Sequence, residues 1–168
     1  DIATISDTVS KADGGTFESD VTFADGADII TASAGTDNVR LGEDAGASIA
    51  SGGNNNVTIG KNAGTATTTG DANVAVGTSA LAANTTANNN TAVGNSALAS
   101  NTTGTPNSAF GFEALDANTT GSRNTALGVG TLGANTTADD NTAVGYAALL
   151  SNTTGVHNTA VGSTGQNS

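Results

Sequence analysis

A five-residue pattern of polar and apolar positions recurs along most of the chain. It consists of Asn, then Val, Thr or Ser, then usually Ala, then a large aliphatic residue or Phe, and finally Gly. The eight copies begin at Asn38, Asn56, Asn73, Asn90, Asn107, Asn124, Asn141 and Asn158, so the first step is 18 residues long and every later step is 17. Such a fixed period predicts a solenoid in which each repeat is one coil stacked on the next.

Each coil is predicted to contain two short strands joined by turns. The fourth position of the pattern is bulky and apolar in every copy, so we expect it to point into the coil, together with the second position on the same strand face. A second apolar site follows the glycine by four residues, at Leu81, Leu98, Leu115, Leu132 and Leu149. The glycine itself is expected at a turn, where the backbone has a positive φ or approaches a neighbour closely.

Asparagine recurs at two positions of the unit, once at its start and once in an Asn-Thr-Thr triplet. The triplets begin at Asn84, Asn101, Asn118, Asn135 and Asn152. Stacked coils about 4.8 Å apart would place equivalent side chains in hydrogen-bonded amide ladders and form a rod roughly 40 Å long. A helix is disfavoured by the frequent Gly, Asn and Thr, and a disordered chain would not keep its apolar residues in phase.

The core of such a coil is thin, which indicates that chains assemble. Two medium apolar side chains per coil contribute only a few kcal/mol against the entropy of ordering 17 residues. The alanines at the third position, among them Ala75, Ala92 and Ala109, are expected to face neighbouring chains and to allow close approach. The predicted fold class is therefore all-β: a stacked β-solenoid (β-roll) of 17-residue coils, assembled as a parallel homotrimer.

The residues before the repeats have different patterns. Apolar residues at spacings of three and four predict the end of a coiled-coil stalk over residues 1–15, and the β-branched ones among them favour a trimer. Alternation around Phe17 and Phe23, with a turn at Asp25 and Gly26, predicts a β connector over residues 16–37. The repeats then occupy residues 38–168, with the eighth incomplete. Because the sequence starts at Asp1 and stops within a repeat, we interpret it as a piece of a longer or processed chain.

Charge and composition narrow the functional classes. The net charge is −11 at pH 7, and most of the acidic residues lie before residue 45. The four basic residues are Lys11, Arg40, Lys61 and Arg123, too few and too scattered for a nucleic-acid interface. No apolar run has the length of a membrane span. The chain has no cysteine, which excludes disulfides and thiolate metal sites.

The repeat resembles those of two families of surface fibres. The strings NVTIG, NVAVG and NTAVG look like the head repeats of trimeric autotransporter adhesins, although 17 residues exceeds the usual adhesin unit. The longer unit, with SALASNTTG and AALLSNTTG, is similar to repeats in tail fibres of bacteriophages, especially those of marine and cyanobacterial hosts. The resemblance covers roughly residues 38 to 162. It implies a homotrimeric fibre for surface attachment and implies no catalytic residue.

Two functions follow from this resemblance as expectations. The first is a structural module of a phage tail fibre or similar virion fibre, which spaces or carries a receptor-binding tip and contacts other tail proteins. The alternative is the head of a bacterial adhesin at the cell surface that itself binds matrix or glycan. Neither involves an enzyme, a cofactor, nucleic acid or membrane insertion.

Recognition residues are expected where stacking leaves the sequence free to vary. These positions are the two residues before each anchor Asn and the two after each anchor Gly. The candidates are Arg123, Asp139, Asp140 and His157 before the asparagines, and Phe112 and Tyr146 after the glycines. The two aromatic rings either fill gaps between chains or, if exposed, contact the faces of sugars.

Four other chemistries have plainer interpretations. The Asp139–Asp140 pair could hydrolyse glycosides, but solvated turn residues explain it better, and His157 has no nucleophile beside it in the sequence. The acids Asp25, Asp28, Asp37, Glu43 and Asp44 could bind Ca²⁺, yet their spacing matches no EF-hand. The Asn-Thr-Thr triplets match glycosylation acceptors, but ladder stacking already explains their spacing. Adjacent threonines would point to opposite faces, which argues against an ice-binding array.

Overall fold

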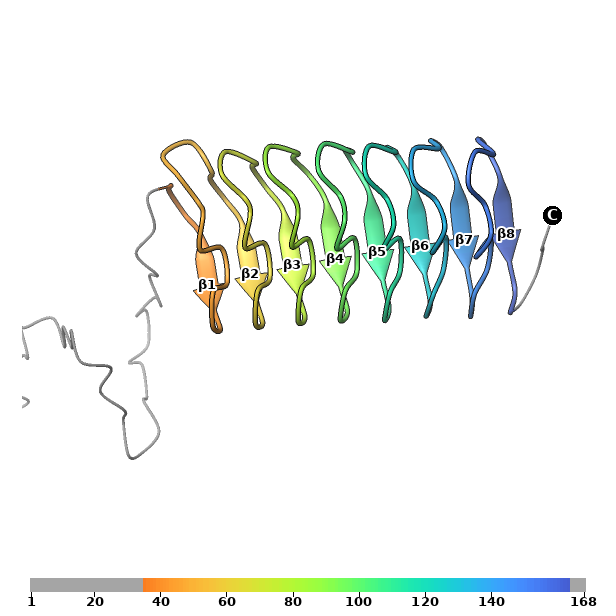
Figure 1. Ribbon diagram of the computed structural model, residues 1–168, viewed down its shortest axis with the longest axis horizontal. Helices are drawn as coiled ribbons and strands as arrows, with labels where there is room; N and C mark the ends of the chain where they lie inside the picture. The colour runs from red at the N-terminus through yellow and green to blue at the C-terminus, as the bar shows by residue number, and fades with distance from the viewer. Residues whose placement is uncertain (1–34, 164–168) are drawn as a thin grey trace, which may run out of the picture.

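The computed structural model describes residues 35–163, and this part of the chain is a rod of stacked coils (Figure 1). Its strands are β1 (Val39–Leu41), β2 (Val57–Ile59), β3 (Val74–Val76), β4 (Thr91–Val93), β5 (Ser108–Phe110), β6 (Thr125–Leu127), β7 (Thr142–Val144) and β8 (Thr159–Val161). They form one parallel sheet in sequence order, and each residue pairs with the residue at the same position of the next strand. The predicted β-solenoid with one coil per repeat is confirmed, over about seven turns.

The described residues contain strands and turns but no helix. The predicted coiled-coil end at residues 1–15 lies outside the described part of the chain. So do residues 16–34 of the predicted β connector and residues 164–168 of the incomplete eighth repeat.

Each coil contains one strand, so the expectation of two strands per coil is wrong. The leucine of the second apolar site has a left-handed backbone, with φ of 51° at Leu98 and 53° at Leu115. The residue two positions earlier is also left-handed, with φ of 58° at Ser96 and 53° at Glu113. Two left-handed residues this close cannot extend into a strand. The rest of each coil is therefore a succession of turns.

The middle residue of each strand points into the coil, and its two neighbours point outward. Ala92, Ala109 and Ala126 are fully buried, whereas Val93 is half-buried and Leu127 is 48% exposed. This reverses the prediction, which placed the fourth position inside and turned the alanines toward other chains. The turn leucines fill the narrow interior, and only a methyl group from the strand fits opposite them.

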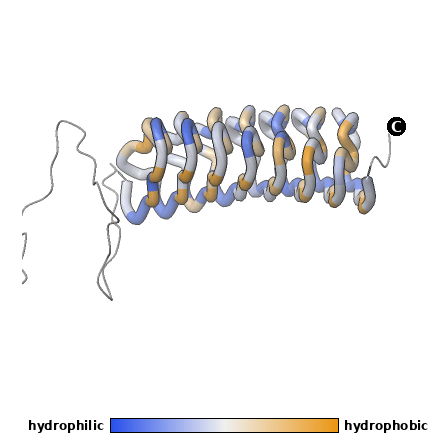
Figure 2. Tube along the Cα trace, turned by 90° about the horizontal axis from the view of Figure 1, so that it is seen from below, coloured by the Kyte–Doolittle hydropathy of each residue, from blue (hydrophilic) through white to orange (hydrophobic). Residues whose placement is uncertain are grey.

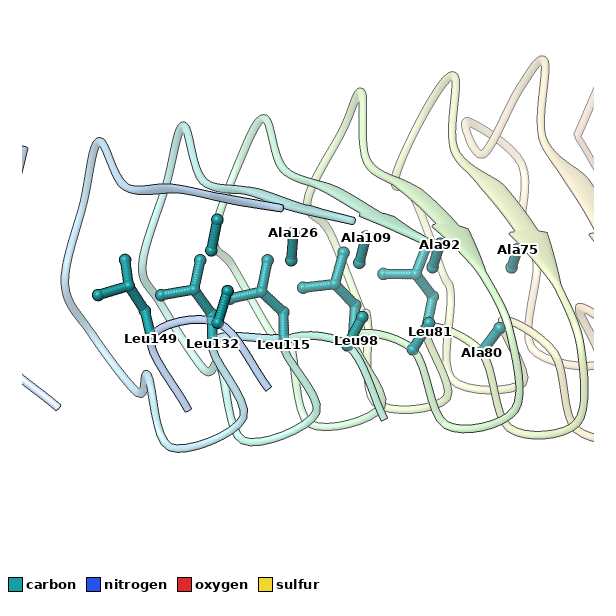
Figure 3. Close-up of a cluster of buried hydrophobic side chains, with 14 of the residues drawn as sticks. Ala75, Ala80, Leu81, Ala92, Leu98, Ala109, Leu115, Ala126, Leu132 and Leu149 are labelled. Atoms are coloured by element: carbon teal, nitrogen blue, oxygen red, sulfur yellow. The ribbon is translucent and has the colours of Figure 1, made fainter. Parts of the chain in front are cut away.

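The core is a row of leucines facing a row of alanines. Figure 3 shows Leu81, Leu98, Leu115, Leu132 and Leu149 following one another along the rod, opposite the strand alanines. The first four leucines are exposed by 1% or less. The prediction that this second site is buried is confirmed.

The anchor asparagines form a buried ladder along the rod. The side-chain oxygen of each accepts a hydrogen bond from the backbone N–H of the next, as in Asn107 to Asn90 at 2.8 Å and Asn124 to Asn107 at 3.0 Å. The side-chain nitrogen donates to a carbonyl near the end of the same coil, as Asn107 does to Gly121 at 2.8 Å. Each anchor therefore joins its own coil to both neighbouring coils.

The triplet asparagines form a second ladder beside the first. Asn118 donates to the side-chain oxygen of Asn101 at 2.9 Å and to the carbonyl of Gly121 at 2.9 Å. The carbonyl of Gly121 thus accepts from asparagines of both ladders, Asn107 and Asn118. Among the described residues no buried side-chain nitrogen or oxygen lacks a partner. The predicted amide ladders are confirmed, and a row of hydrophilic residues runs the length of the rod in Figure 2.

The glycine after each strand is required by its conformation and by its neighbour. Its φ is 129° at Gly77, in a region that residues with a side chain rarely adopt. A Cβ placed on Gly77 would lie 2.6 Å from the carbonyl carbon of Gly94 in the next coil. The glycine column therefore lets consecutive coils approach at the turn, as the sequence predicts.

Candidate recognition surface

The variable residues lie in columns at the two ends of the strand layer. One column contains the residue before each anchor asparagine, and the other contains the residue after each anchor glycine. Most members of the first column have positive φ, including Arg123 at 58°, Asp140 at 60° and His157 at 58°. Because this backbone conformation repeats from coil to coil, side chains in consecutive coils lie above one another.

Four of the six predicted residues form one exposed cluster. The Nε of Arg123 donates to Oδ1 of Asp140 at 2.6 Å, and its Nη2 lies 2.9 Å from Oδ2 of Asp140 and 3.2 Å from Oδ2 of Asp139. The Nε2 of His157 lies 3.6 Å from Oδ2 of Asp140. Arg123, Asp140 and His157 thus form a ladder of side chains across three consecutive coils.

The ion pairs shift the pKa values of their members. The hydrogen bond from Arg123 lowers the pKa of Asp140 below its usual value, and the positive charge of Arg123 acts in the same direction. The same bond raises the pKa of Arg123. Lys61 and Glu43 form a comparable pair at 2.8 Å, in which the hydrogen bond that Lys61 donates to Glu43 raises the pKa of Lys61. The side chains of Arg123, Lys61 and Glu43 are more than half exposed and that of Asp140 is partly exposed, so solvent screens these pairs and each is individually weak.

The two adjacent carboxylates share Arg123 as a partner. Oδ2 of Asp139 and both oxygens of Asp140 accept from the Arg123 guanidinium, and Oδ1 of Asp139 also accepts a hydrogen bond from the backbone N–H of Ser122 at 2.7 Å. Both carboxylates therefore connect neighbouring coils. This arrangement accounts for the acidic pair without assigning it a reaction.

The aromatic candidates lie in the second column. Phe112, Val129 and Tyr146 occupy the same position of three consecutive coils and are 48%, 43% and 62% exposed in the single chain. Backbone bonds from Gly130 to the Phe112 carbonyl and from Ala147 to the Val129 carbonyl join these coils. Exposure in one chain suits both interpretations of the rings, contact with a neighbouring chain and contact with a sugar.

The six predicted residues do not form a single site. The ion-pair column precedes the strand and the aromatic column follows it, so the three-residue strand lies between them. Sequence reasoning grouped them because both columns vary. The structure places them in two separate columns, one with Arg123, Asp140 and His157 and one with Phe112 and Tyr146, and the second column also contains the Glu43–Lys61 ion pair of the first two coils.

Other candidate chemistries find no assembled site in the described residues. Within residues 35–163 no three acidic or histidine side chains are grouped to hold a metal ion. Asp25 and Asp28 lie outside this range. The side-chain nitrogens of Asn101 and Asn118, which glycosylation would modify, are buried and already donate hydrogen bonds. Across residues 35–163, no helix is long and apolar enough to span a membrane.

One cavity opens at the last complete coil. Its volume is about 290 Å³, and its lining includes Leu149, Asn152, Gly155 and Asn158. The equivalent residues of earlier coils are covered by the coil that follows them. The cavity is thus the end of the stack.

Sequence reasoning missed the outer face of the sheet, because it placed those side chains in the interior. The alanine column was a signal for the correct orientation of the strands. When another element fills the core, a strand with a small middle residue and large residues on both sides places the large residues outside. Comparisons of the chain with family models, with curated proteins and with solved structures found no match in any of the three.

Proposed function

We propose that this chain is a structural module of a bacteriophage tail fibre, or of a similar surface fibre, that assembles as a homotrimer. Its role is to space or to carry a receptor-binding tip, and its partners are copies of itself and other tail proteins. The observation that supports this proposal is the strict repetition of the rod. Eight strands pair position by position, so the length of the rod is set by the number of coils.

The interior of the rod serves stacking. The buried polar residues of the described chain are the asparagine ladders and a few threonines, and the buried apolar residues are mainly alanine and leucine. Each coil uses these groups to hold the next coil. Such an arrangement suits a mechanical spacer, because coils can be added or removed without loss of a reacting group.

Removing whole coils tests the spacer role. Deleting residues 90–123 removes two complete coils and joins equivalent positions, so the protein should fold and the rod should shorten by about 10 Å. Small-angle scattering measures that length. The matched control, deletion of residues 90–115, breaks the register and should prevent folding. A chain that tolerates both deletions equally would contradict the proposal.

Localisation and adsorption test the fibre role. An antibody against the purified rod should decorate tails of virions from the source that encodes this chain, when viewed by electron microscopy. Virions with the two-coil deletion should still adsorb to their host, and the purified rod should not compete with them. Absence of the protein from virions would overturn this assignment.

The second candidate is an adhesin head at a bacterial surface, and the exposed rings of Phe112 and Tyr146 favour it. In that case the purified rod itself binds matrix or glycan. Changing both residues to Ala would weaken binding at least tenfold without lowering the melting temperature. A large fall in melting temperature would instead assign both rings to packing.

A further inference from the structure

The outer face of the sheet is uncharged along its whole length. It consists of the second and fourth positions of the eight repeats, from Val39 and Leu41 in β1 to Thr159 and Val161 in β8. Eleven of these sixteen residues are Val, Ile, Leu or Phe, and the other five are Thr or Ser. A protein with a net charge of −11 therefore leaves one extended face without a single charge.

Several of these side chains are open to solvent in the single chain. Leu41, Phe110, Leu127 and Val161 are 46%, 39%, 48% and 78% exposed, and most of the remaining outer residues are half-buried. They lie in two columns parallel to the rod, because every strand pairs in the same register. The outer face therefore has a continuous stripe that is apolar at the fourth position in all eight strands and at the second position in the first three. An apolar stripe on a protein surface indicates an interface.

The size of the stripe matches a small specific interface. Seven strand spacings of about 4.8 Å give a length near 34 Å, and two side-chain columns about 7 Å apart cover a width near 14 Å. The projected area is roughly 500 Å² per chain, or about 1,000 Å² for two chains, which is where biological interfaces begin. The corrugated side chains offer more accessible area than this projection.

The spacing of the side chains along the stripe indicates which partner packs against it. Its side chains recur once per strand, so a partner that packs against all eight strands must present the same spacing over about 34 Å. A second copy of this chain does so when it lies parallel and in register. The charged groups of the described rod, such as Arg123 and Asp140, lie outside the stripe, so two copies do not oppose like charges there.

We propose that the outer face of the sheet is the surface through which copies of this chain pack, parallel and in register, toward a common axis. This deepens the proposed function and rests on it only for homomeric assembly. It also reassigns the interface. The third-position alanines, which the sequence suggested would face other chains, lie in the core, and the second and fourth positions take over that role.

A charge on the stripe tests the assignment. Leu127→Lys places a cation among apolar neighbours, and Val156→Lys is the matched control, since Val156 is 49% exposed but precedes β8 by three residues and lies off the stripe. Light scattering coupled to size-exclusion chromatography should show that the parent chain and the Val156→Lys variant form the same oligomer. Leu127→Lys should dissociate at concentrations at least 100-fold higher than the parent chain.

Cysteine cross-linking tests the same face even if the lysine variant fails to fold. The chain has no cysteine, so a single Val93→Cys substitution gives one reactive thiol on the stripe. Oxidation should link Val93→Cys chains to one another rapidly, and Val156→Cys chains slowly. Mixed Val93→Cys and Leu127→Cys chains should form no mixed dimers, because packing in register keeps these positions two strands apart.

The two kinds of failure are distinguishable. An oligomer that survives Leu127→Lys, or that cross-links faster through Val156→Cys, overturns the assignment of the face and leaves the homomeric fibre in place. A parent chain that stays folded and monomeric at 100 µM overturns both this inference and the homotrimer.

Discussion

The first two coils, residues 38–72, and the next five, residues 73–157, share one backbone conformation. The side chains that fill the interior come from opposite parts of the coil in the two regions. In the later coils the strand contributes a small residue and the turn a large one, as with Ala92 and Leu98. In the second coil the strand contributes Thr58, and Gly64 occupies the leucine position with the same left-handed backbone, φ 56°. A Cβ on Gly64 would lie 2.8 Å from the Thr58 methyl carbon.

The first coil also has a larger residue on the strand and glycine in the turn, and its strand residue is larger still. Arg40 occupies the alanine position, and its Nε donates to the carbonyl of Ala45 at 2.7 Å. Gly46 occupies the leucine position with φ of 55°, and Ile49 fills part of the space, since its Cδ1 would lie 2.7 Å from a Cβ on Gly46. The comparison teaches that each coil has a fixed interior volume, which the strand or the turn can occupy but not both.

The largest expected effect concerns the feature that both regions share, the glycine after the strand. Gly60→Ala in the early region and Gly77→Ala in the later one should each lower the free energy of unfolding by about 4 kcal/mol or more. A Cβ on Gly60 would lie 2.7 Å from the carbonyl carbon of Gly77, and one on Gly77 would lie 2.6 Å from that of Gly94. Urea unfolding followed by circular dichroism measures both losses.

Gly162→Ala is the matched control for this column. Gly162 has the same kind of backbone, φ 141°, but a Cβ there would meet no atom of the described chain within 4 Å. Its substitution should cost only the backbone strain, about 1–3 kcal/mol. If Gly77→Ala costs no more than Gly162→Ala, close approach of the coils is not the reason for the glycine.

A double-mutant cycle tests the exchange of volume directly. In the fifth coil, Ala109→Thr should cost about 1–3 kcal/mol by overpacking, and Leu115→Gly about 2–5 kcal/mol by opening a cavity. The double variant reproduces the pairing of Thr58 with Gly64. Its loss of unfolding free energy should be smaller than the sum of the single losses by about 0.5–3 kcal/mol. Additive losses would refute the shared volume.

The second asparagine ladder is another difference between the early and the later coils, and its expected effect on stability is smaller. It begins at Asn84, because the second coil has the buried Thr67 at the equivalent position. Asn118→Thr, which copies that substitution, should cost about 1–3 kcal/mol, since it removes the bonds to Asn101 and Gly121. Thr67→Asn should extend the ladder and stabilise the protein by about 0.5–1.5 kcal/mol. Thermal unfolding measures the change in stability of both variants. Two changes of the same sign would contradict the role of the second ladder.

The smallest effects concern surface and edge charges in the later coils. Arg123 lowers the pKa of Asp140, so the carboxylate stabilises the fold above its unfolded-state pKa of about 3.9, and this stabilisation is lost as the pH falls through the lower folded-state value. Burial raises the pKa of Asp116, so the contribution of this carboxyl group to stability is fully present at low pH. It is lost as the pH rises through the higher folded-state pKa.

Asparagine variants measure these opposite contributions. At pH 7, Asp140→Asn should slightly lower the melting temperature, and Asp116→Asn should slightly raise it. Both differences should shrink as the pH falls and the parent carboxyl groups become protonated, and 0.5 M salt should reduce the first. Changes of the same sign at pH 7 would show that the two charges do not lie in different environments.

The candidate recognition residues were predictable as positions but not as groups. Variation before each anchor Asn and after each anchor Gly correctly indicated residues outside the core, including Tyr146 and Arg123. Their division into two columns depends on which of them precede the strand and which follow it. The interface proposed on the outer face was missed from the sequence, because its residues were assigned to the interior.

The sequence by itself determined the period, the columns and the chemistry of each column. A 17-residue step in register requires equivalent residues to stack, so the asparagine ladders, the glycine turns and the buried leucines followed from spacing alone. Only the tertiary structure decided which side of each strand lies inside. A three-residue strand such as β4 has one residue on one face and two on the other, and nothing local distinguishes inward from outward. The choice is made by the left-handed leucine turn, which closes the coil so tightly that only alanine fits opposite it.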